Sequence, residues 1–172
     1  MPLRPAHATF ALLGVIALLT SCASRSDPLS EAEQNYRDWL TAADDIRRRT
    51  VTDDTAATLR RLSSDDVLMA PRFSVVDHML AGARQTGYRH IVAFRIVQRP
   101  QGSGALPPPE DAVTAEACVD ATLVDQVDGV GDSLAGEYDA RRYARFVVLT
   151  RDESGILVIS EERETASDIC EG

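Results

Sequence analysis

The chain has no lysine, few aromatic residues, and no apolar run long enough to cross a membrane as a helix. All 18 basic residues are arginine, against 27 acidic residues, so the net charge at neutral pH is −9. Nucleic-acid binding needs clustered basic surface, so this balance argues against nucleic-acid partners. It also argues against adhesion of the folded part to anionic lipid. The absence of lysine by itself says nothing about mechanism.

Cysteine and histidine are also scarce, with three of each. No Cys-x-x-Cys pair or neighbouring histidine completes a tetrahedral metal site. The acidic Asp125–Asp132 segment fails as a calcium loop, because Val124 and Gln126 stand where EF-hand ligands are needed. Ser103 lacks the Gly-x-Ser-x-Gly context of a hydrolase nucleophile. The sequence therefore predicts no metal, no cofactor and no set of catalytic residues.

The first 21 residues have the pattern of an export signal. Arg4 and the free amine supply a positive region, and an apolar run follows from Phe10 to Leu19. A spanning helix needs roughly 20 apolar residues, so this run is too short. The segment Leu19-Thr20-Ser21-Cys22 resembles the lipobox of bacterial lipoproteins. The resemblance implies that residues 1–21 are removed and that the Cys22 sulfur carries a diacylglycerol. An ordinary cleaved signal peptide and a signal anchor are the alternatives.

If Cys22 carries lipid, two cysteines remain, Cys118 and Cys170. Disulfides persist outside the cytoplasm, so these two are expected to be bonded, and two buried free thiols are the alternative. In the chain-entropy model such a bridge raises the free energy of unfolding by about 4 kcal/mol. Residues 22–29 form a tether of roughly 25 Å when fully extended. The domain is therefore expected close to the membrane, where an envelope protein partner is favoured.

Residues 22–172 have the length of one domain, and we place its folded part at residues 30–172. Removal of Arg4 with the signal leaves 17 arginines against 27 acidic residues, a net charge of −10.

Helical periodicity opens the folded part. Ser30 and Glu33 have the spacing of a capping box, and apolar residues including Tyr36 and Trp39 then recur at helical spacing. The helix is expected to end in Arg47–Arg49, a basic run that suits the negative end of the helix dipole. This run is therefore interpreted as a solvated last turn and not as a binding patch.

The rest of the chain changes from helical to strand periodicity. A short second helix is expected after Asp53 or Asp54, and a third from Ser74, ending by Gly87. Beyond Gly87 the apolar period becomes two. The expected strands are His90–Arg99, Val113–Val124, Arg142–Arg151 and Ile156–Glu162. The expected connections are a Gly- and Pro-rich loop, Gln101–Pro109, and turns at Asp128-Gly129 and Ser154-Gly155.

Alternation in the second expected strand separates a core face from an outer face. The core face should hold Ala115, Ala117, Val119, Ala121 and Leu123. The outer face should hold Glu116, Cys118, Asp120 and Thr122. The same reasoning places Arg95 and Arg145 on the outer face. Cross-strand ion pairs there, each worth roughly 0–1 kcal/mol, are the expected role of these charges.

The two histidines of the domain are expected in different surroundings. His78 lies about 130° from the apolar centre of the third helix and should be exposed. His90 shares an alternation face with Val92, Phe94 and Ile96, which should point toward the helices.

Helices followed by strands predict an α+β fold. The order of elements, the strand Ala117-Cys118-Val119-Asp120, the following Asp-Gly turn and a cysteine near the end resemble small actinobacterial lipoproteins with an NTF2-like domain. The resemblance covers roughly Ser30 to Cys170. It implies N-terminal helices packed on a curved antiparallel sheet of about four strands, shaped as a cone with a pocket between helix and sheet. The candidate pocket residues are Tyr36, Trp39, His90 and Phe94.

An NTF2-like fold does not specify an activity, because it hosts enzymes and inert scaffolds alike. We expect a non-catalytic interaction or accessory module, held at the outer side of the cell membrane by lipid on Cys22. A carrier of a small apolar ligand is the alternative, and an enzyme is a third. A carrier predicts an apolar cavity with few inward charges, and an enzyme predicts a buried histidine or aspartate in that cavity. A scaffold predicts a filled cone and an exposed apolar patch.

Overall fold

The computed structural model describes residues 27–65, 67–68, 82–97, 109, 111–134 and 141–171. The predicted signal peptide, Cys22, the helix expected from Ser74 with His78, and nearly all of the Gln101–Pro109 loop lie outside these residues. None of the helices in the described ranges is long and apolar enough to cross a membrane.

The first helix, α1, spans Pro28–Arg48 and begins earlier than expected. The Asp27 side chain accepts the Leu29 backbone N–H at 3.2 Å, and proline at the first helical position has its φ already set for a helix. The predicted Ser30–Glu33 capping box is therefore wrong. Glu33 instead forms an ion pair with Arg37, one turn on, at 2.6 Å.

The short second helix is confirmed as α2, which spans Asp53–Leu62 and begins at Asp53 itself, slightly earlier than predicted. Thr52 caps it in a capping box with Thr55. Just after the helix, Ser63 forms a parallel bridge with Ile159 of the last strand, and the Ser64 N–H donates to the Ile159 carbonyl at 2.9 Å. The end of α2 is thereby held against the edge of the sheet.

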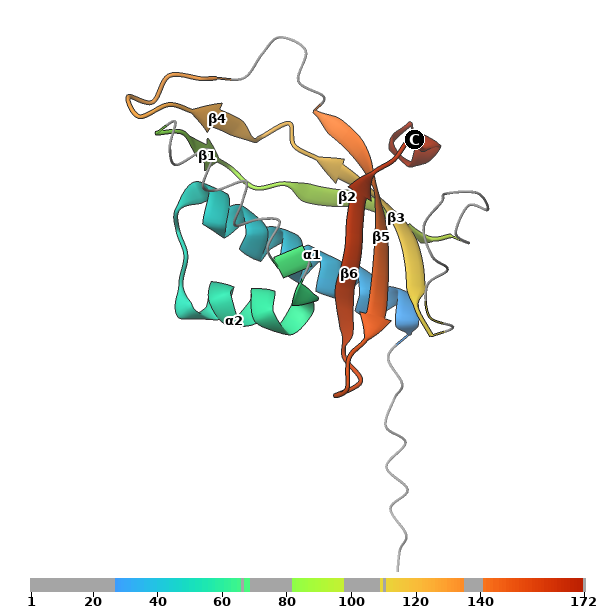
Figure 1. Ribbon diagram of the computed structural model, residues 1–172. Coiled ribbons are helices and arrows are strands. Elements are labelled where there is room, and N and C mark those ends of the chain that lie inside the picture. The colour runs from blue at the N-terminus through green and yellow to red at the C-terminus, as the bar shows by residue number, and fades with distance from the viewer. Residues whose placement is uncertain are drawn as a thin grey trace, which may run out of the picture.

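The main sheet has four antiparallel strands in the order β2-β3-β5-β6. Their bounds are β2 His90–Ile96, β3 Val113–Asp120, β5 Arg142–Arg151 and β6 Leu157–Glu164. The two helices lie on one side of the curved sheet (Figure 1). The predicted α+β arrangement of helices on a curved antiparallel sheet is therefore confirmed.

A second, two-stranded sheet was not anticipated. It pairs β1 (Arg84–Thr86) with β4 (Asp125–Val127), beside the C-terminal end of α1 in Figure 1. The strand predicted to continue to Val124 instead ends at Asp120, whose side chain accepts the Thr122 N–H at 2.8 Å and forms a turn. Ala121 and Leu123 are consequently not part of the core, and Leu123 is 75% exposed.

The core lies between α1, α2 and the inner, helix-facing side of the sheet. Tyr36, Trp39 and Leu40 of α1 are almost fully buried there. The Trp39 Nε1 donates to the Ser63 Oγ at 2.8 Å, and the buried Asn35 side chain donates to the Leu157 carbonyl at 2.8 Å. The polar groups that the helices bring into the core therefore have partners.

The outer face of the sheet carries the predicted disulfide. Cys118 of β3 is bonded to Cys170 of the 3-10 helix η1 (Asp168–Cys170), and Cys118 is 1% exposed. The predicted ion pair between Arg95 and Glu116 is also present on this face, at 2.7 Å. The disulfide and a second contact of Arg95, with the Asp168 carboxylate at 2.5 Å, hold the C-terminal segment against the sheet.

A β-bulge in β2 changes which residues face the helices. Ile91 pairs with Val119 and Ala93 with Cys118, so Val92 has no partner in β3. An extra residue reverses the alternation, so His90 lies opposite Asp120 on the outer side while Phe94 keeps its predicted inward direction. The expectation that His90 and Val92 share the face of Phe94 is therefore wrong.

Arg145 is likewise on the opposite face from the one predicted. It pairs with Ala117 in the β3–β5 register, and directly opposed residues share a face of the sheet. Because Ala117 belongs to the inner face, the Arg145 side chain is on the inner face too.

Candidate functional site

A chain of polar side chains crosses the inner face of the sheet beside the aromatic core. We call it the inner ionic network, and it links α1, the start of β2, β5 and β6. Its members are Tyr36, Asp44, Arg47, Arg89, Tyr143, Arg145 and Glu162. Buried charges need partners, so this network is the first place to look for function.

Asp44 is the most deeply buried member, with no exposed surface. Its Oδ2 accepts the Arg89 backbone N–H at 2.8 Å, and its Oδ1 accepts the Arg89 Nε at 2.7 Å. The Arg89 Nη2 lies 2.6 Å from the same Oδ1, and the Arg47 Nη1 lies 3.3 Å from it. Both carboxylate oxygens are therefore committed to arginine N–H groups of the protein itself.

The other end of the network lies on β5 and β6. The Tyr143 hydroxyl accepts from the Arg89 Nη1 at 3.3 Å, and the Arg145 guanidinium lies 4.8 Å from the Tyr143 ring centroid. The Arg145 Nε lies 3.6 Å from the Glu162 Oε1, which also accepts the Tyr36 hydroxyl at 3.0 Å. Tyr36 thus joins the network to the aromatic core.

Burial and neighbouring charges set the protonation states of this network. Burial raises the pKa of Tyr36 well above its usual value, and the nearby Glu162 carboxylate raises it further. Tyr36 therefore remains a neutral donor at physiological pH. Burial by itself would lower the pKa of Arg89, but the Asp44 charge more than offsets this and the pKa is raised. Burial lowers the pKa of Arg47.

Asp44 and Tyr36, the two most deeply buried titratable groups of this network, are both engaged within the protein. A catalytic acid or base must reach the proton that it transfers. Asp44 is sealed by four contacts to arginines, and Tyr36 donates to Glu162. Within the described ranges, no group of three or more His, Cys, Asp and Glu residues is arranged to hold a metal ion.

Three of the four predicted pocket residues meet in the core. The rings of Tyr36 and Trp39 are stacked with centroids 5.9 Å apart, and those of Tyr36 and Phe94 are tilted at 6.3 Å. These rings pack against one another and line none of the described pockets. His90 lies apart from these rings, because the bulge in β2 places it on the outer face of the sheet.

Sequence reasoning missed most of the inner ionic network. Asp44 lies four positions after Leu40 and next to Ala43, within the apolar stripe of α1. A carboxylate within an apolar stripe indicates that a buried cation pairs with that carboxylate, and this was the one sign of the network in the sequence. Nothing in the local pattern marked Arg89 as that cation, because the two residues are 45 positions apart.

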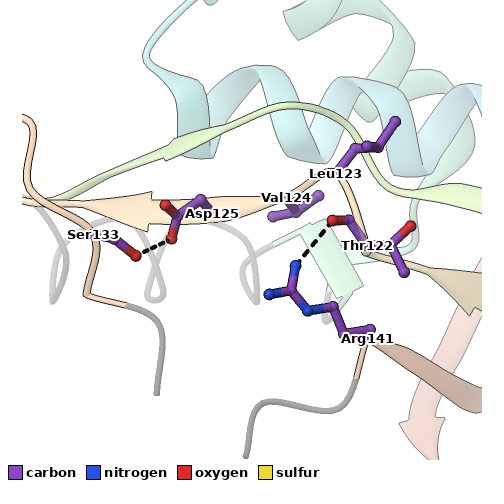
Figure 2. Close-up of a pocket in the computed structure, with 6 residues that line it drawn as sticks. All are labelled: Thr122, Leu123, Val124, Asp125, Ser133 and Arg141. Atoms are coloured by element: carbon purple, nitrogen blue, oxygen red, sulfur yellow. Dashed lines mark hydrogen bonds between the residues drawn. The ribbon is translucent and has the colours of Figure 1, made fainter. Parts of the chain in front are cut away.

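Two shallow surface pockets are present in the described part of the molecule. One, of about 210 Å³, lies between α1 and the strand β2, and His90 and Arg37 help to line it. The other, of about 200 Å³, lies where β3 leads into β4 (Figure 2). In Figure 2 Arg141 donates to the Thr122 carbonyl at 3.0 Å and Ser133 to Asp125 at 2.8 Å. Part of this polar lining is already hydrogen-bonded within the protein.

Comparison with protein-family models found no matching family, and comparison with curated protein sequences found no match. Among solved structures, the chain is similar to the intermembrane space region of the chloroplast protein ARC6, with a TM-score of 0.49 and 15% identity over 82% of this chain and 98% of that one. It is also similar to a de novo designed β-sheet protein solved by NMR, with a TM-score of 0.38 and 10% identity over 78% of this chain and 87% of that one. These similarities do not identify an activity.

Proposed function

We propose that this protein is a lipid-anchored module on the extracytoplasmic face of the cell membrane, and that it acts by binding and not by catalysis. The non-catalytic part of this proposal rests on what occupies the inner face of the sheet. Aromatic rings and the inner ionic network occupy it, and both oxygens of its buried Asp44 are engaged by Arg47 and Arg89.

The two alternatives fit the described residues less well. A carrier of an apolar ligand would have few inward charges, yet Asp44, Arg47, Arg89, Arg145 and Glu162 all belong to the inner network. An enzyme of this shape would use a histidine or aspartate facing a cavity. His90 is exposed and Asp44 is enclosed by arginines.

Three exposed apolar side chains near β4 are our candidates for the surface that binds a partner. Leu123, Val130 and Leu134 are 75%, 84% and 52% exposed. All three belong to the segments that flank the short strand β4. Exposed apolar groups of this kind are typical of interaction surfaces when they gather together.

The anchor is supported by the lipobox-like segment and by the disulfide, which suits a compartment outside the cytoplasm. We predict that Cys22→Ala releases the full chain from the membrane fraction, because the lipid is the membrane attachment. Fractionation of cells that express each form, with labelled fatty acid as tracer, measures this. Cys22→Ala should retain the Cys118–Cys170 bond, and unchanged membrane association with no label on the parent would refute the anchor.

Native mass spectrometry tests the binding role against the carrier. We predict that the protein, purified without denaturation, has only the mass of its own chain and attached lipid, lighter than the reduced form by two hydrogen atoms. The physical reason is that the aromatic rings of the described inner face pack against one another and its charged groups pair with one another. The same sample after denaturation is the control. An additional mass that disappears on denaturation would favour the carrier.

A further inference from the structure

The strand β2 lies at an edge of the main sheet, because among the described strands only β3 pairs with it. The Val97 N–H donates to the Thr114 carbonyl at 2.9 Å, so these two residues form a hydrogen-bonded pair of the ladder. Such pairs alternate, so the backbone groups of Arg95 point toward β3, and those of Phe94 and Ile96 point away from it. Within the described ranges, the outward N–H and C=O groups of Phe94 and Ile96 have no hydrogen-bond partner. We call this stretch the open edge of β2.

Two other edge positions of the same sheet are covered by the protein itself. On β6, at the opposite edge, the Ile159 carbonyl accepts the Ser64 N–H at 2.9 Å. At the start of β2, the Ile91 carbonyl accepts the Arg37 Nη1 at 3.0 Å. Proteins commonly cover or charge their sheet edges to prevent unwanted pairing, so a stretch left open between covered positions needs an explanation.

The side chains of the open edge also suit the addition of a strand. Val92 and Ile96 are large apolar residues, yet they are 51% and 49% exposed. From Ile91 to Val97 the sequence contains a single charged residue, Arg95, and no proline or glycine, a composition that favours strand pairing. A strand placed beside β2 would remove the Ile96 side chain from water and supply partners to the outward backbone groups.

The chemistry of the open edge selects an extended polypeptide, because a strand presents its N–H and C=O groups at the spacing that another strand matches. A second copy of this chain fits poorly. Each copy has a net charge of −9, so two copies repel each other. Pairing Phe94 of one copy with Ile96 of the other also sets the two Arg95 side chains opposite each other, where like charges are destabilising. The negative charge of the chain instead favours a basic partner.

We propose that an extended, basic segment of a partner protein adds to the main sheet beside β2. Its backbone would bond to Phe94 and Ile96, and its alternate apolar side chains would lie beside Ile96. The proposal names a class of partner for the non-catalytic binding role proposed above, on which it rests. It does not depend on the lipid anchor, and its surface is separate from the apolar side chains near β4.

The test is amide hydrogen exchange, followed by NMR on the full chain with its disulfide intact. The probe is a synthetic peptide in which valine alternates with lysine and threonine. In the chain alone, we expect the Phe94 and Ile96 amides to exchange faster than the Arg95 amide, which points toward β3. At saturating peptide, exchange of these two amides should slow by roughly tenfold or more. The same peptide with N-methyl groups on alternate residues should give no protection, because it has lost the donors of one edge.

Ile96→Lys should weaken peptide binding by roughly tenfold or more, because apolar contact is lost and a charge is placed on the edge. Val51→Lys is the matched control. Val51 is 54% exposed, lies between α1 and α2, and gains the same charge, so this variant should bind the peptide as the parent does. Leu123→Lys places that charge near β4 and should also leave binding unchanged.

Three results would overturn the proposal. One is protection of the Phe94 and Ile96 amides in the chain alone, which assigns the edge to the chain itself, or to a second copy if protection rises with protein concentration. Another is no added protection at millimolar peptide in the parent, a measurement that does not depend on whether any variant folds. The third is binding that is lost in Leu123→Lys but retained in Ile96→Lys. Membrane fractionation and the search for a small-ligand mass do not depend on these results, so failure here is separable from failure of the proposed function.

Discussion

Asp44→Asn is expected to lower the free energy of unfolding by about 3–5 kcal/mol, because it leaves the buried Arg89 charge uncompensated. The Arg89 side chain is 9% exposed and its other described hydrogen bond is the 3.3 Å contact with Tyr143. The isosteric amide retains the shape of the carboxylate but not its charge. Equilibrium denaturation followed by circular dichroism measures the change.

Asp38→Asn is the matched control for this prediction. Asp38 lies on the same helix, and its described hydrogen bond is an exposed one from Gln34 at 2.8 Å. Its replacement should change stability by no more than about 0.5 kcal/mol. A double variant, Asp44→Asn with Arg89→Met, should lose less stability than the sum of the two single variants, because both charges are then absent. A loss below about 1 kcal/mol for Asp44→Asn would contradict a structural role for the pair.

Loss of the disulfide is expected to lower the free energy of unfolding by about 2–5 kcal/mol. This is the second large effect that we predict. Cys118 and Cys170 are 52 positions apart, so the bond removes much freedom from the unfolded chain. It also holds η1 over the outer face, where Arg95 bridges to Glu116 and Asp168. Denaturation of the Cys118→Ala/Cys170→Ala variant, and of the parent before and after reduction, measures the loss.

Cys22→Ala provides the control for general effects of cysteine replacement, because Cys22 lies outside the folded part that we predict. Its unfolding midpoint should equal that of the parent in the same detergent. If reduction of the parent left the midpoint unchanged, the bond would contribute nothing and the chain-entropy argument would fail for this protein.

Local pattern was enough to find several elements of the fold. The strand predicted at Arg142–Arg151 is β5 with the same bounds, and α2 begins within two residues of its predicted start. Side-chain alternation and capping are properties of neighbouring residues, so they can be read along the chain. The disulfide was predictable by counting, because two cysteines remain once Cys22 is assigned to lipid.

The register of the strands could not be predicted from local periodicity. One extra residue at Val92 moves His90 to the outer face, and the pairing of Arg145 with Ala117 places an arginine on the inner face. A shift of one residue reverses every side chain, yet it leaves the pattern of the sequence unchanged. Predicted site residues on strands are therefore less secure than those on α1, where Tyr36 and Trp39 are buried as expected.

The sequence by itself determined the α+β class, the positions of most helices and strands, and which two cysteines could pair, because these follow from local periodicity and residue counts. Only the tertiary structure decided the inner ionic network. Asp44 and Arg89 come from α1 and the start of β2, while Arg145 and Glu162 come from neighbouring strands. Charges so far apart in sequence become partners only when packing removes water from between them, and no local pattern records that event.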